Sequence, residues 1–423
     1  MTTTDSRRTI DAVWRMESPK LIAGLLRMVR DVALAEEIAQ DALVVALERW
    51  PETGVPDNPG AWLMATAKHR AIDLLRQRKL HGQKHEELGR EIDAEREATA
   101  ADAQEAVDVA LDDDVGDDLL RLMFTACHPV LATEARVALT LRLLGGLTTA
   151  EIARAFLVPE PTIAQRIVRA KRALAEANVP FEVPRGPELG ARLASVLEVI
   201  YLVFNEGYAA TAGDDWMRPG LCEDALRLGR VLAELAPGEP EVHGLVALME
   251  LQASRTAARS GSGGAPILLL DQNRALWNQL LIGRGLAALA RAEALGGADG
   301  PYVLQAAIAA CHARARTADA TDWPRIAALY ARLAAVVRSP VVELNRAVAV
   351  GMAEGPAAGL ALVDALCAEP SLASYHLLPS VRADLLAKLG RRAEARRELE
   401  RAASLTRNAR EREMLLARAA ELA

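Results

Sequence analysis

Residues 147–174 read LTTAEIARAFLVPEPTIAQRIVRAKRAL, and this stretch decides the fold of the segment around it. Thr148 or Thr149 is placed to cap the N-terminus of a short helix, because a hydroxyl can accept a hydrogen bond from a free backbone N–H. Residues 157–159 supply a turn, and Pro161 suits the first turn of a second helix, where its missing N–H is not needed. The stretch therefore predicts a helix-turn-helix.

The second helix of this stretch has an apolar stripe and a basic face. Ile163, Ile167, Ala170 and Leu174 recur at i, i+4, i+7 and i+11, which predicts that they are buried. Polar and cationic residues at such positions can reach base edges in the major groove and, further along, phosphates. The predicted DNA contacts are Thr162, Gln165, Arg166, Arg169, Lys171 and Arg172. A merely solvated basic face is the alternative, but the turn and the stripe together favour DNA binding.

The composition favours helices throughout the chain. It has 423 residues, of which 51% are hydrophobic and only 4% aromatic, and Ala, Leu, Arg and Glu are abundant. Such a composition favours close-packed helices over sheets. The length predicts two to four domains, each with its own core, and excludes a disordered or collagen-like chain. We therefore expect an all-α fold.

Neither a membrane segment nor a disulfide framework is expected. No apolar run reaches the roughly 18 residues that span a bilayer, and residues 1–30 lack a signal-peptide core. A cytoplasmic protein is expected, in which thiols stay reduced. The four cysteines are too widely spaced for a CxxC site and are predicted to be small buried hydrophobic residues: Cys127, Cys222, Cys311 and Cys367.

Charge is distributed unevenly along the chain. The formal net charge is −7, but residues 86–118 alone carry 14 acidic and two basic residues, a net charge of −12. Residues 62–84 and residues 136–172 each carry +5. An acidic segment repels itself and buries little, so residues 86–118 are predicted to be a largely solvated tether between two basic helical modules.

The first basic module has a helical face that suits single-stranded DNA. Five residues recur at i, i+4, i+7, i+11 and i+14: Trp62, Thr66, His69, Asp73 and Arg76. An aromatic ring can stack on an unpaired base while cations hold the backbone. The alternative is that Trp62 is a core residue, which is the more common role of a tryptophan near the start of a helix.

A second break, with three prolines in residues 179–187, precedes a long helical region. Predicted helices span residues 224–235, ended by Pro237, and residues 324–337, ended by Pro340. These prolines lie 103 positions apart, close to three periods of a 34-residue helical repeat. A last pair covers residues 377–389 and 393–405, with Gly390 between them, and residues 260–264 form a surface loop. An irregular helical bundle is the alternative to a repeat.

Three further segments carry a family resemblance. Residues 35–43 (AEEIAQDAL), 58–63 (NPGAWL) and 71–76 (AIDLLR) resemble region 2 of extracytoplasmic-function (ECF) sigma factors, and the helix-turn-helix resembles their region 4. The two regions cover roughly residues 10–178 in the family's order. The resemblance implies a bacterial initiation subunit that binds core RNA polymerase, opens promoter DNA near −10 and reads the −35 element.

The resemblance also assigns roles to residues. It implies that region 2 docks on the polymerase through Glu36, Glu37, Gln40 and Asp41. The −10 strand would meet Trp62, Thr66, His69, Asp73 and Arg76. The −35 element would meet Thr162, Gln165, Arg166, Arg169, Lys171 and Arg172. The acidic tether would pass toward the active-site and RNA-exit channel, unless it is an inert spacer.

The region beyond the helix-turn-helix has a resemblance of its own. Residues 195–210 (SVLEVIYLVFNEGYAA) resemble the start of the extension in an ECF subgroup with a tetratricopeptide-like C-terminal part. Members generally lack an obvious cognate anti-sigma factor, which implies that the extension regulates the protein. The expected organisation is region 2 (1–84), acidic linker (85–118), region 4 (119–178), Pro-rich linker (179–188) and helical-repeat regulatory extension (189–423). A protein or ligand regulator of the extension is a further expected partner.

Two other classes of function compete with this interpretation. An enzyme would need a site, and residues 205–208 (NEGY) and 214–216 (DDW) are polar clusters that suit helix ends and turns at least as well. Adjacent Cys127–His128 and Cys311–His312 point apart on a helix, so no metal, cofactor or catalysis is expected. A one-component transcription activator with a C-terminal sensor would explain the helix-turn-helix and the extension, but not the region 2 motifs.

Overall fold

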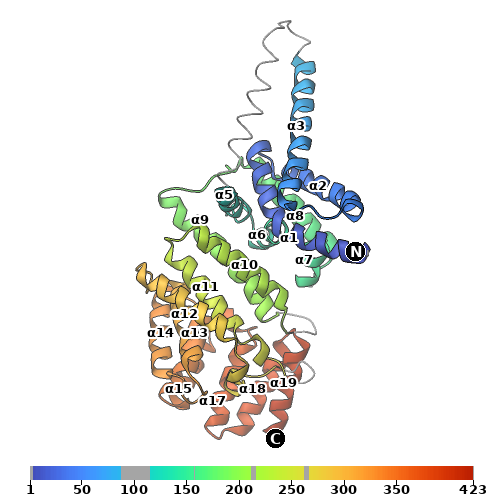
Figure 1. Cartoon of the computed structure of the whole chain (residues 1–423). Coiled ribbons are helices and arrows are strands. Elements are labelled where there is room, and N and C mark those ends of the chain that lie inside the picture. Colours follow the sequence, from blue (N-terminus) through green and yellow to red (C-terminus); the bar gives the residue numbers. More distant parts are fainter. Residues whose placement is uncertain (1–2, 87–114, 157, 211–215, 262–265, 423) are drawn as a thin grey trace. The chain divides into compact units, whose positions relative to one another are not determined.

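The computed structural model confirms the all-α prediction (Figure 1). It describes residues 3–86, 115–156, 158–210, 216–261 and 266–422. These residues form helices, turns and one isolated bridge between Ser260 and Pro266, and they contain no strand. None of the helices described is long and apolar enough to cross a membrane.

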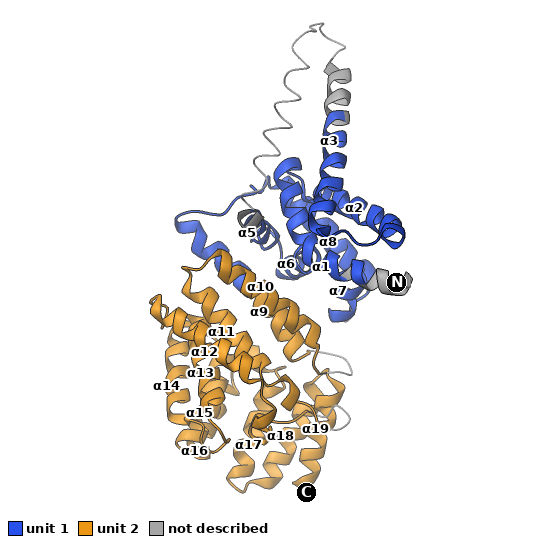
Figure 2. Ribbon diagram, in the orientation of Figure 1, with its two compact units in different colours: residues 1–199 blue, residues 200–423 orange. Residues whose placement is uncertain are grey.

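The chain divides into two compact units, residues 1–199 and residues 200–423, and each is described by itself (Figure 2). The division falls inside one helix, α9, and not at the Pro-rich segment 179–188. That segment does interrupt the helices, since α8 ends at Glu176 and α9 begins at Pro187. The helices of the first unit are α1 (Thr3–Val29), α2 (Val32–Thr53), α3 (Pro59–Glu86), α5 (Val115–Ala126), α6 (Thr133–Leu143), α7 (Thr149–Phe156), α8 (Glu160–Glu176) and the first part of α9 (Pro187–Tyr208).

Helices α1, α2 and α3 pack on one another, as the predicted region 2 requires. The Asp31 carboxylate caps α2 by accepting hydrogen bonds from the backbone N–H groups of Ala33 and Leu34, at 2.8 and 3.1 Å. Asn58 caps α3 in the same way, and Pro59 occupies its first turn. Local side chains therefore fix where two of the three helices begin.

The end of the acidic segment differs from the expectation. Residues 87–114 lie outside the described residues, but α5 begins at Val115 and includes Asp118. Asp118 is only 3% exposed and pairs with Arg27 of α1 and Arg121 of α5. The segment is predicted to be largely solvated, and Asp118 departs from this because two arginines neutralise its carboxylate where α5 packs on α1.

The first residues of the predicted extension belong to the N-terminal unit. The Arg192 guanidinium donates to the Phe124 carbonyl at 3.0 Å, and the Ser195 hydroxyl donates to the Cys127 carbonyl at 2.6 Å. Both carbonyls lie at the C-terminal end of α5, where they have no partner within the helix. The start of α9 is therefore bonded to the end of α5, in agreement with a division that leaves residues 187–199 in the N-terminal unit.

The C-terminal unit consists of short helices that each pack against the next in the chain. After the end of α9 come α10 (Pro219–Leu235), α11 (Pro240–Ala253), α12 (Gln279–Ala294), α13 (Pro301–Arg314), α14 (Trp323–Val336), α15 (Pro340–Ala353), α16 (Pro356–Leu366), α17 (Leu377–Lys388), α18 (Arg392–Leu405) and α19 (Ala409–Glu421). Single 3-10 turns are η2 (Thr256–Ala258), η4 (Leu269–Asp271), η5 (Arg274–Leu276) and η6 (Pro370–Leu372).

Four helices predicted for this region are confirmed, with small differences at their ends. Pro340 does not merely follow α14 but begins α15, because proline is favoured in the first turn of a helix. Gly390 separates α17 from α18 with φ +77°, a left-handed conformation that glycine adopts without strain. Of the predicted loop 260–264, residues 262–264 lie outside the described residues.

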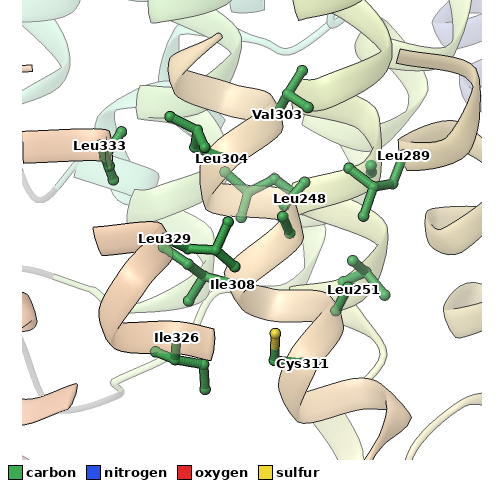
Figure 3. Close-up of a cluster of buried hydrophobic side chains, with 14 of the residues drawn as sticks. Leu248, Leu251, Leu289, Val303, Leu304, Ile308, Cys311, Ile326, Leu329 and Leu333 are labelled. Atoms are coloured by element: carbon green, nitrogen blue, oxygen red, sulfur yellow. The ribbon is translucent and has the colours of Figure 1, made fainter. Parts of the chain in front are cut away.

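A continuous core lies between α11, α12, α13 and α14 (Figure 3). Leu251, Leu304 and Ile326 are at most 2% exposed. Three of the cysteines are buried, as predicted, and burial raises the pKa of the Cys127 thiol to about 11. Cys367 is exposed, because it directly follows the last residue of α16 rather than lying on its buried face. The prediction that all four cysteines are buried is therefore wrong for Cys367.

Candidate nucleic-acid interface

The helix-turn-helix forms as predicted from α7 and α8. Thr148 is the cap of α7: its hydroxyl accepts from the Glu151 backbone N–H at 3.2 Å, and the Glu151 carboxylate accepts from the Thr148 backbone N–H at 2.8 Å. This reciprocal pair is a capping box. Pro161 lies in the first turn of α8, and Leu157 lies outside the described residues.

The stripe of α8 is buried and its basic face is presented to solvent. Ile163, Ile167, Ala170 and Leu174 are at most 6% exposed, as the spacing predicted. Gln165, Arg169 and Arg172 are exposed, whereas Thr162, Arg166 and Lys171 are half-buried. Arg172 pairs along the helix with Glu176 at 2.7 Å. Three of the six predicted −35 contacts are thus exposed and available to a partner.

Lys171 has a different environment from the other residues of this group. It pairs with Glu36 of α2, one of the residues assigned by resemblance to polymerase docking. Arg142 of α6 pairs with the same carboxylate at 2.6 Å, and Gln40 donates to it at 2.8 Å. Glu36 is only 4% exposed. The structure therefore joins one predicted polymerase contact to one predicted DNA contact.

The charges explain how a buried carboxylate is tolerated. Burial alone raises the pKa of Glu36, but the nearby charges of Lys171 and Arg142 and their hydrogen bonds lower the pKa by more, so it lies below its ordinary value. Glu36 is ionised at neutral pH and holds α2, α6 and α8 together. Breaking a buried pair on one side leaves an uncompensated charge and costs several kcal/mol.

A second contact joins the same two regions. Arg15 of α1 donates to the Glu151 carboxylate of the capping box at 2.5 Å. Gly146, with φ +69°, lies just before α7, and a Cβ atom placed there would come within 3.1 Å of the Arg15 Cα. Sequence reasoning did not identify Arg15 or Arg142. Arg142 lies 106 positions from Glu36, and no local spacing relates the two.

The predicted −10 face lies on α3. Trp62 is half-buried, and its ring meets the buried Trp50 ring edge-on, with centroids 5.3 Å apart. The Thr66 hydroxyl donates to the Trp62 carbonyl at 2.9 Å. His69, Asp73 and Arg76 are exposed on the same helix. The alternative of a core role holds in part for Trp62, since it packs on Trp50 while part of it stays accessible.

The remaining predicted polymerase contacts lie along α2. Glu37 is exposed, and Gln40 and Asp41 are half-buried. Asp41 pairs with Arg70 of α3 at 3.2 Å. Of the four residues assigned to polymerase docking, Glu36 alone has its side chain almost fully enclosed.

The two polar clusters noted in the sequence, residues 205–208 and 214–216, lie at and just beyond the C-terminal end of α9 in the chain. In residues 205–208, Glu206 is 9% exposed and pairs with Arg218. A Cβ atom at Gly207 would lie 2.7 Å from the Cys222 backbone nitrogen, so this glycine permits the close approach of α9 and α10. Asp214 and Asp215 lie outside the described residues. Within the described residues no three His, Cys, Asp or Glu side chains are grouped to hold a metal ion.

Family models match three parts of the chain. A model described as Sigma-70 region 2 matches residues 13–81, one described as Sigma-70, region 4 matches residues 121–174, and one described as a family of unknown function, DUF6596, matches residues 192–293. No solved structure matches the chain significantly.

Known proteins resemble either the whole chain or its first part. The uncharacterized protein R00370 of Rhizobium meliloti is 44% identical over 403 residues, covering 95% of this chain and 93% of that protein. The ECF RNA polymerase sigma factor SigK of Mycobacterium ulcerans is 30% identical over 159 residues, 36% of this chain and 77% of that protein. A probable ECF RNA polymerase sigma factor of Mycobacterium tuberculosis, SigI, is 25% identical over 174 residues, 41% of this chain and 57% of that protein. The chain therefore belongs to the sigma-70 family, with region 2 and region 4 domains similar in sequence to those of ECF RNA polymerase sigma factors and with a further helical region that R00370 shares.

Proposed function

We propose that this protein is an ECF-type sigma factor that binds core RNA polymerase and directs promoter recognition and transcription initiation. The observation that carries the proposal is the combination, in one chain, of a sigma region 2 match with a region 4 helix-turn-helix. A DNA-binding activator requires only the second of these. Phosphate contacts and base contacts would together supply affinity and specificity.

In this proposal α8 reads the −35 element and α3 contacts the −10 strand. The exposed positions of Gln165 and Arg169 on α8, and of His69 and Arg76 on α3, support these roles. The half-buried Trp62 would offer the accessible part of its ring for stacking on an unpaired base. Region 2 would dock on polymerase along α2, through Glu37 and Asp41 and, once freed from Lys171, through Glu36.

The extension, residues 189–423, is proposed to be a tetratricopeptide-like regulatory region. The succession of short helices, each packed against the next, supports this assignment. Regulation by the extension would replace a separate anti-sigma factor. The regulator would be a protein or a ligand held by the C-terminal unit.

Run-off transcription tests the proposed function. Purified full-length protein and core RNA polymerase, without any other sigma factor, should start transcripts at a defined position. The helix-turn-helix variant Arg166→Ala serves as a matched control that keeps the fold of region 2. If transcripts appear only when the housekeeping sigma factor is added, the protein is instead a one-component activator with a C-terminal sensor.

A further inference from the structure

Three arginines of the C-terminal unit gather where several helices end. Arg255 and Arg259 follow the C-terminus of α11, and Arg274 begins η5. The aromatic rings around them come from Tyr208, the last residue of α9, and from Trp277, just after η5. The core of Figure 3 extends to Leu251, Cys311 and Ile326 at one end of the view. Arg255 follows Leu251 by four residues in the chain.

Arg259 is almost completely enclosed. It is 6% exposed, and its guanidinium carbon lies 3.4 Å from the centroid of the Tyr208 ring and 4.4 Å from that of Trp216. It donates one hydrogen bond, to the Tyr208 carbonyl at 2.5 Å. Burial, together with the positive charge of Arg255, lowers the pKa of Arg259 to about 10. A guanidinium has five N–H donors, so most of its donors have no acceptor among the described residues.

The other two guanidinium groups lie close by. Arg255 donates to the Tyr208 hydroxyl at 2.5 Å, and its guanidinium carbon lies 5.7 Å from the Trp277 ring centroid. Arg274 lies 4.8 Å from the same ring and donates to the His312 and Ala315 carbonyls at the end of α13. Arg274 therefore caps α13, as Arg259 caps the end of α9 with one of its donors, and Arg255 is the cation that helix capping does not account for.

No carboxylate balances these charges. Among the described residues, neither Arg255, Arg259 nor Arg274 has an Asp or Glu oxygen within 4 Å, whereas the buried Glu250 of the same unit is paired with Arg230. The C-terminal ends of α9, α11 and α13 each carry about −0.5 of an elementary charge. Three such ends offset about half of the three positive charges. Buried charge is strongly disfavoured unless it is paired, so an anion would be attracted here.

Two indole N–H groups without an acceptor among the residues described also favour an anion at this place. Trp277 is 4% exposed, and its indole Nε1–H has no acceptor in the part of the chain that is described. The Trp216 Nε1–H is also buried without an acceptor. An N–H group can only donate, so both indoles would be satisfied by a ligand rich in acceptor oxygens. Arginine pairs with carboxylate and phosphate through two parallel hydrogen bonds.

We propose that Arg255, Arg259 and Trp277 form a binding site for the carboxylate or phosphate group of a small anionic molecule. The site lies wholly within the C-terminal unit and does not depend on the proposed role in transcription. It would give the extension a ligand of defined chemistry. The carboxylate or phosphate oxygens would accept from the free guanidinium N–H groups and from the indole.

Anion titration of the full-length protein tests the site. Sodium phosphate and sodium succinate represent the two anion types, and sodium chloride at matched ionic strength is the reference for screening. The fluorescence of Trp216, Trp277 and Trp323, the only tryptophans of residues 200–423, should change saturably with one of the two anions. At a hundred times Kd, that anion should raise the melting temperature of the unit by about 5–10 °C over chloride.

Variants separate a specific site from general ion effects. Arg255→Gln should weaken anion binding at least tenfold. Arg255→Lys keeps the positive charge but loses the paired N–H donors of the guanidinium, so it should weaken binding less. The control is Arg332→Gln, because Arg332 pairs with Asp299 on the surface at 2.6 Å, and it should leave Kd unchanged. If Arg255→Gln does not fold, the lysine variant and the wild-type titration still decide the question.

Three outcomes would overturn the proposal. The first is a response to phosphate and succinate that does not exceed the response to chloride. The second is an equal Kd in wild type and in the Arg255 variants. The third is anion binding that appears only in Asp214→Asn/Asp215→Asn, which would mean that the chain supplies the balancing carboxylate itself.

Discussion

The cations of α8 differ from one another at the scale of single residues. Arg166 is half-buried near the start of the helix, where a side chain can be fixed for base contact. Arg172 is exposed near its end and pairs with Glu176. When the second helix of a helix-turn-helix lies in the major groove, residues near its N-terminus contact base edges, and we assign the cations near its C-terminus to phosphate contacts. The two arginines should therefore contribute differently to DNA binding.

Arg166→Ala should weaken binding of the holoenzyme to its −35 element by about 1–3 kcal/mol and relax the preference at one base pair. Arg172→Ala should weaken binding to all sequences alike. It should also reduce by about one the slope of the logarithm of the binding constant against the logarithm of the salt concentration. Fluorescence anisotropy with a set of −35 variants at several salt concentrations measures both effects. A loss in Arg166→Ala that is uniform across sequences would reassign this residue to phosphate contact.

His312 should make the C-terminal unit sensitive to acid. Burial, together with the positive charges of Arg255 and Arg274, lowers the pKa of His312 from 6.5 to about 4. The folded state holds the neutral form, so the unfolded chain takes up a proton first as the pH falls below 6.5. Stability is complete above pH 6.5 and falls by up to roughly 3 kcal/mol between pH 6.5 and pH 4.

Urea unfolding of the C-terminal unit at several pH values measures how its free energy of unfolding depends on pH. His312→Phe should weaken this pH dependence while keeping a ring against Trp323, whose ring centroid lies 5.2 Å from that of His312. Carboxylates also make the free energy of unfolding depend on pH, so the contribution of His312 is the difference in pH dependence between the wild-type and variant proteins. The same pH dependence in both proteins would contradict the assignment to His312.

At the scale of elements, Glu36 links α2 to α6 and α8. Glu36→Gln keeps the volume of the side chain but leaves Lys171 and Arg142 without a counter-charge, which should cost roughly 3 kcal/mol in the N-terminal unit. The amides of α2 and α8 should lose hydrogen-exchange protection. Acid should act in the same direction. The pKa of Glu36 is lower in the folded protein than in the unfolded chain, so its ionised form stabilises the fold above the unfolded pKa. This stabilisation is lost as the pH falls through the pKa of the folded state.

The neighbouring variant Glu37→Gln is the matched control. Glu37 lies on the same helix with an exposed side chain, so its replacement should change stability by no more than about 0.5 kcal/mol. If Glu36→Gln and Glu37→Gln behave alike, the buried pair does not hold α2 to α8. Polymerase binding in Glu36→Gln then reports separately on whether this carboxylate also contacts polymerase.

The contact of α9 with α10 depends on a single missing side chain. Gly207→Ala would bring a Cβ atom to 2.7 Å from the Cys222 nitrogen and 2.9 Å from the Arg218 carbonyl oxygen, both of which are backbone atoms. The forced shift should lower the melting temperature of the C-terminal unit and cost about 1–3 kcal/mol. Gly283→Ala in α12 has nothing within 4 Å and should be neutral or stabilising. Equal melting temperatures for both variants would contradict this account.

At the scale of the whole molecule, the place of truncation matters. A chain that ends at Ala177 loses Arg192 and Ser195, which satisfy the last carbonyls of α5. A chain that ends at Val199 keeps them. We expect the N-terminal unit to melt at a lower temperature in the first than in the second, because buried carbonyls without donors are costly.

This pair of truncations also tests regulation without confusing it with stability. Promoter activity and promoter choice are compared between the full-length protein and the chain that ends at Val199. The proposed regulatory role predicts a difference between them. Equal activity and the same promoters would contradict a regulatory extension.

The sequence by itself determined the helices and the faces of α8. The stripe from Ile163 to Leu174 and the Thr148 cap depend on residues three or four positions apart, which a local pattern contains. Proline and glycine at Pro340 and Gly390 marked helix ends for the same reason. These signals also predicted four helices of the C-terminal unit, α10, α14, α17 and α18.

Only the tertiary structure decided which of these residues meet. The pair of Glu36 with Lys171, the burial of Asp118 and the gathering of Arg255, Arg259 and Trp277 each join separate segments of the chain. Charge at one position does not indicate which distant charge will neutralise it. The exposure of Cys367 likewise followed from where α16 ends. Local periodicity fixes which side of a helix is buried, and the packing of distant helices fixes what lies against it.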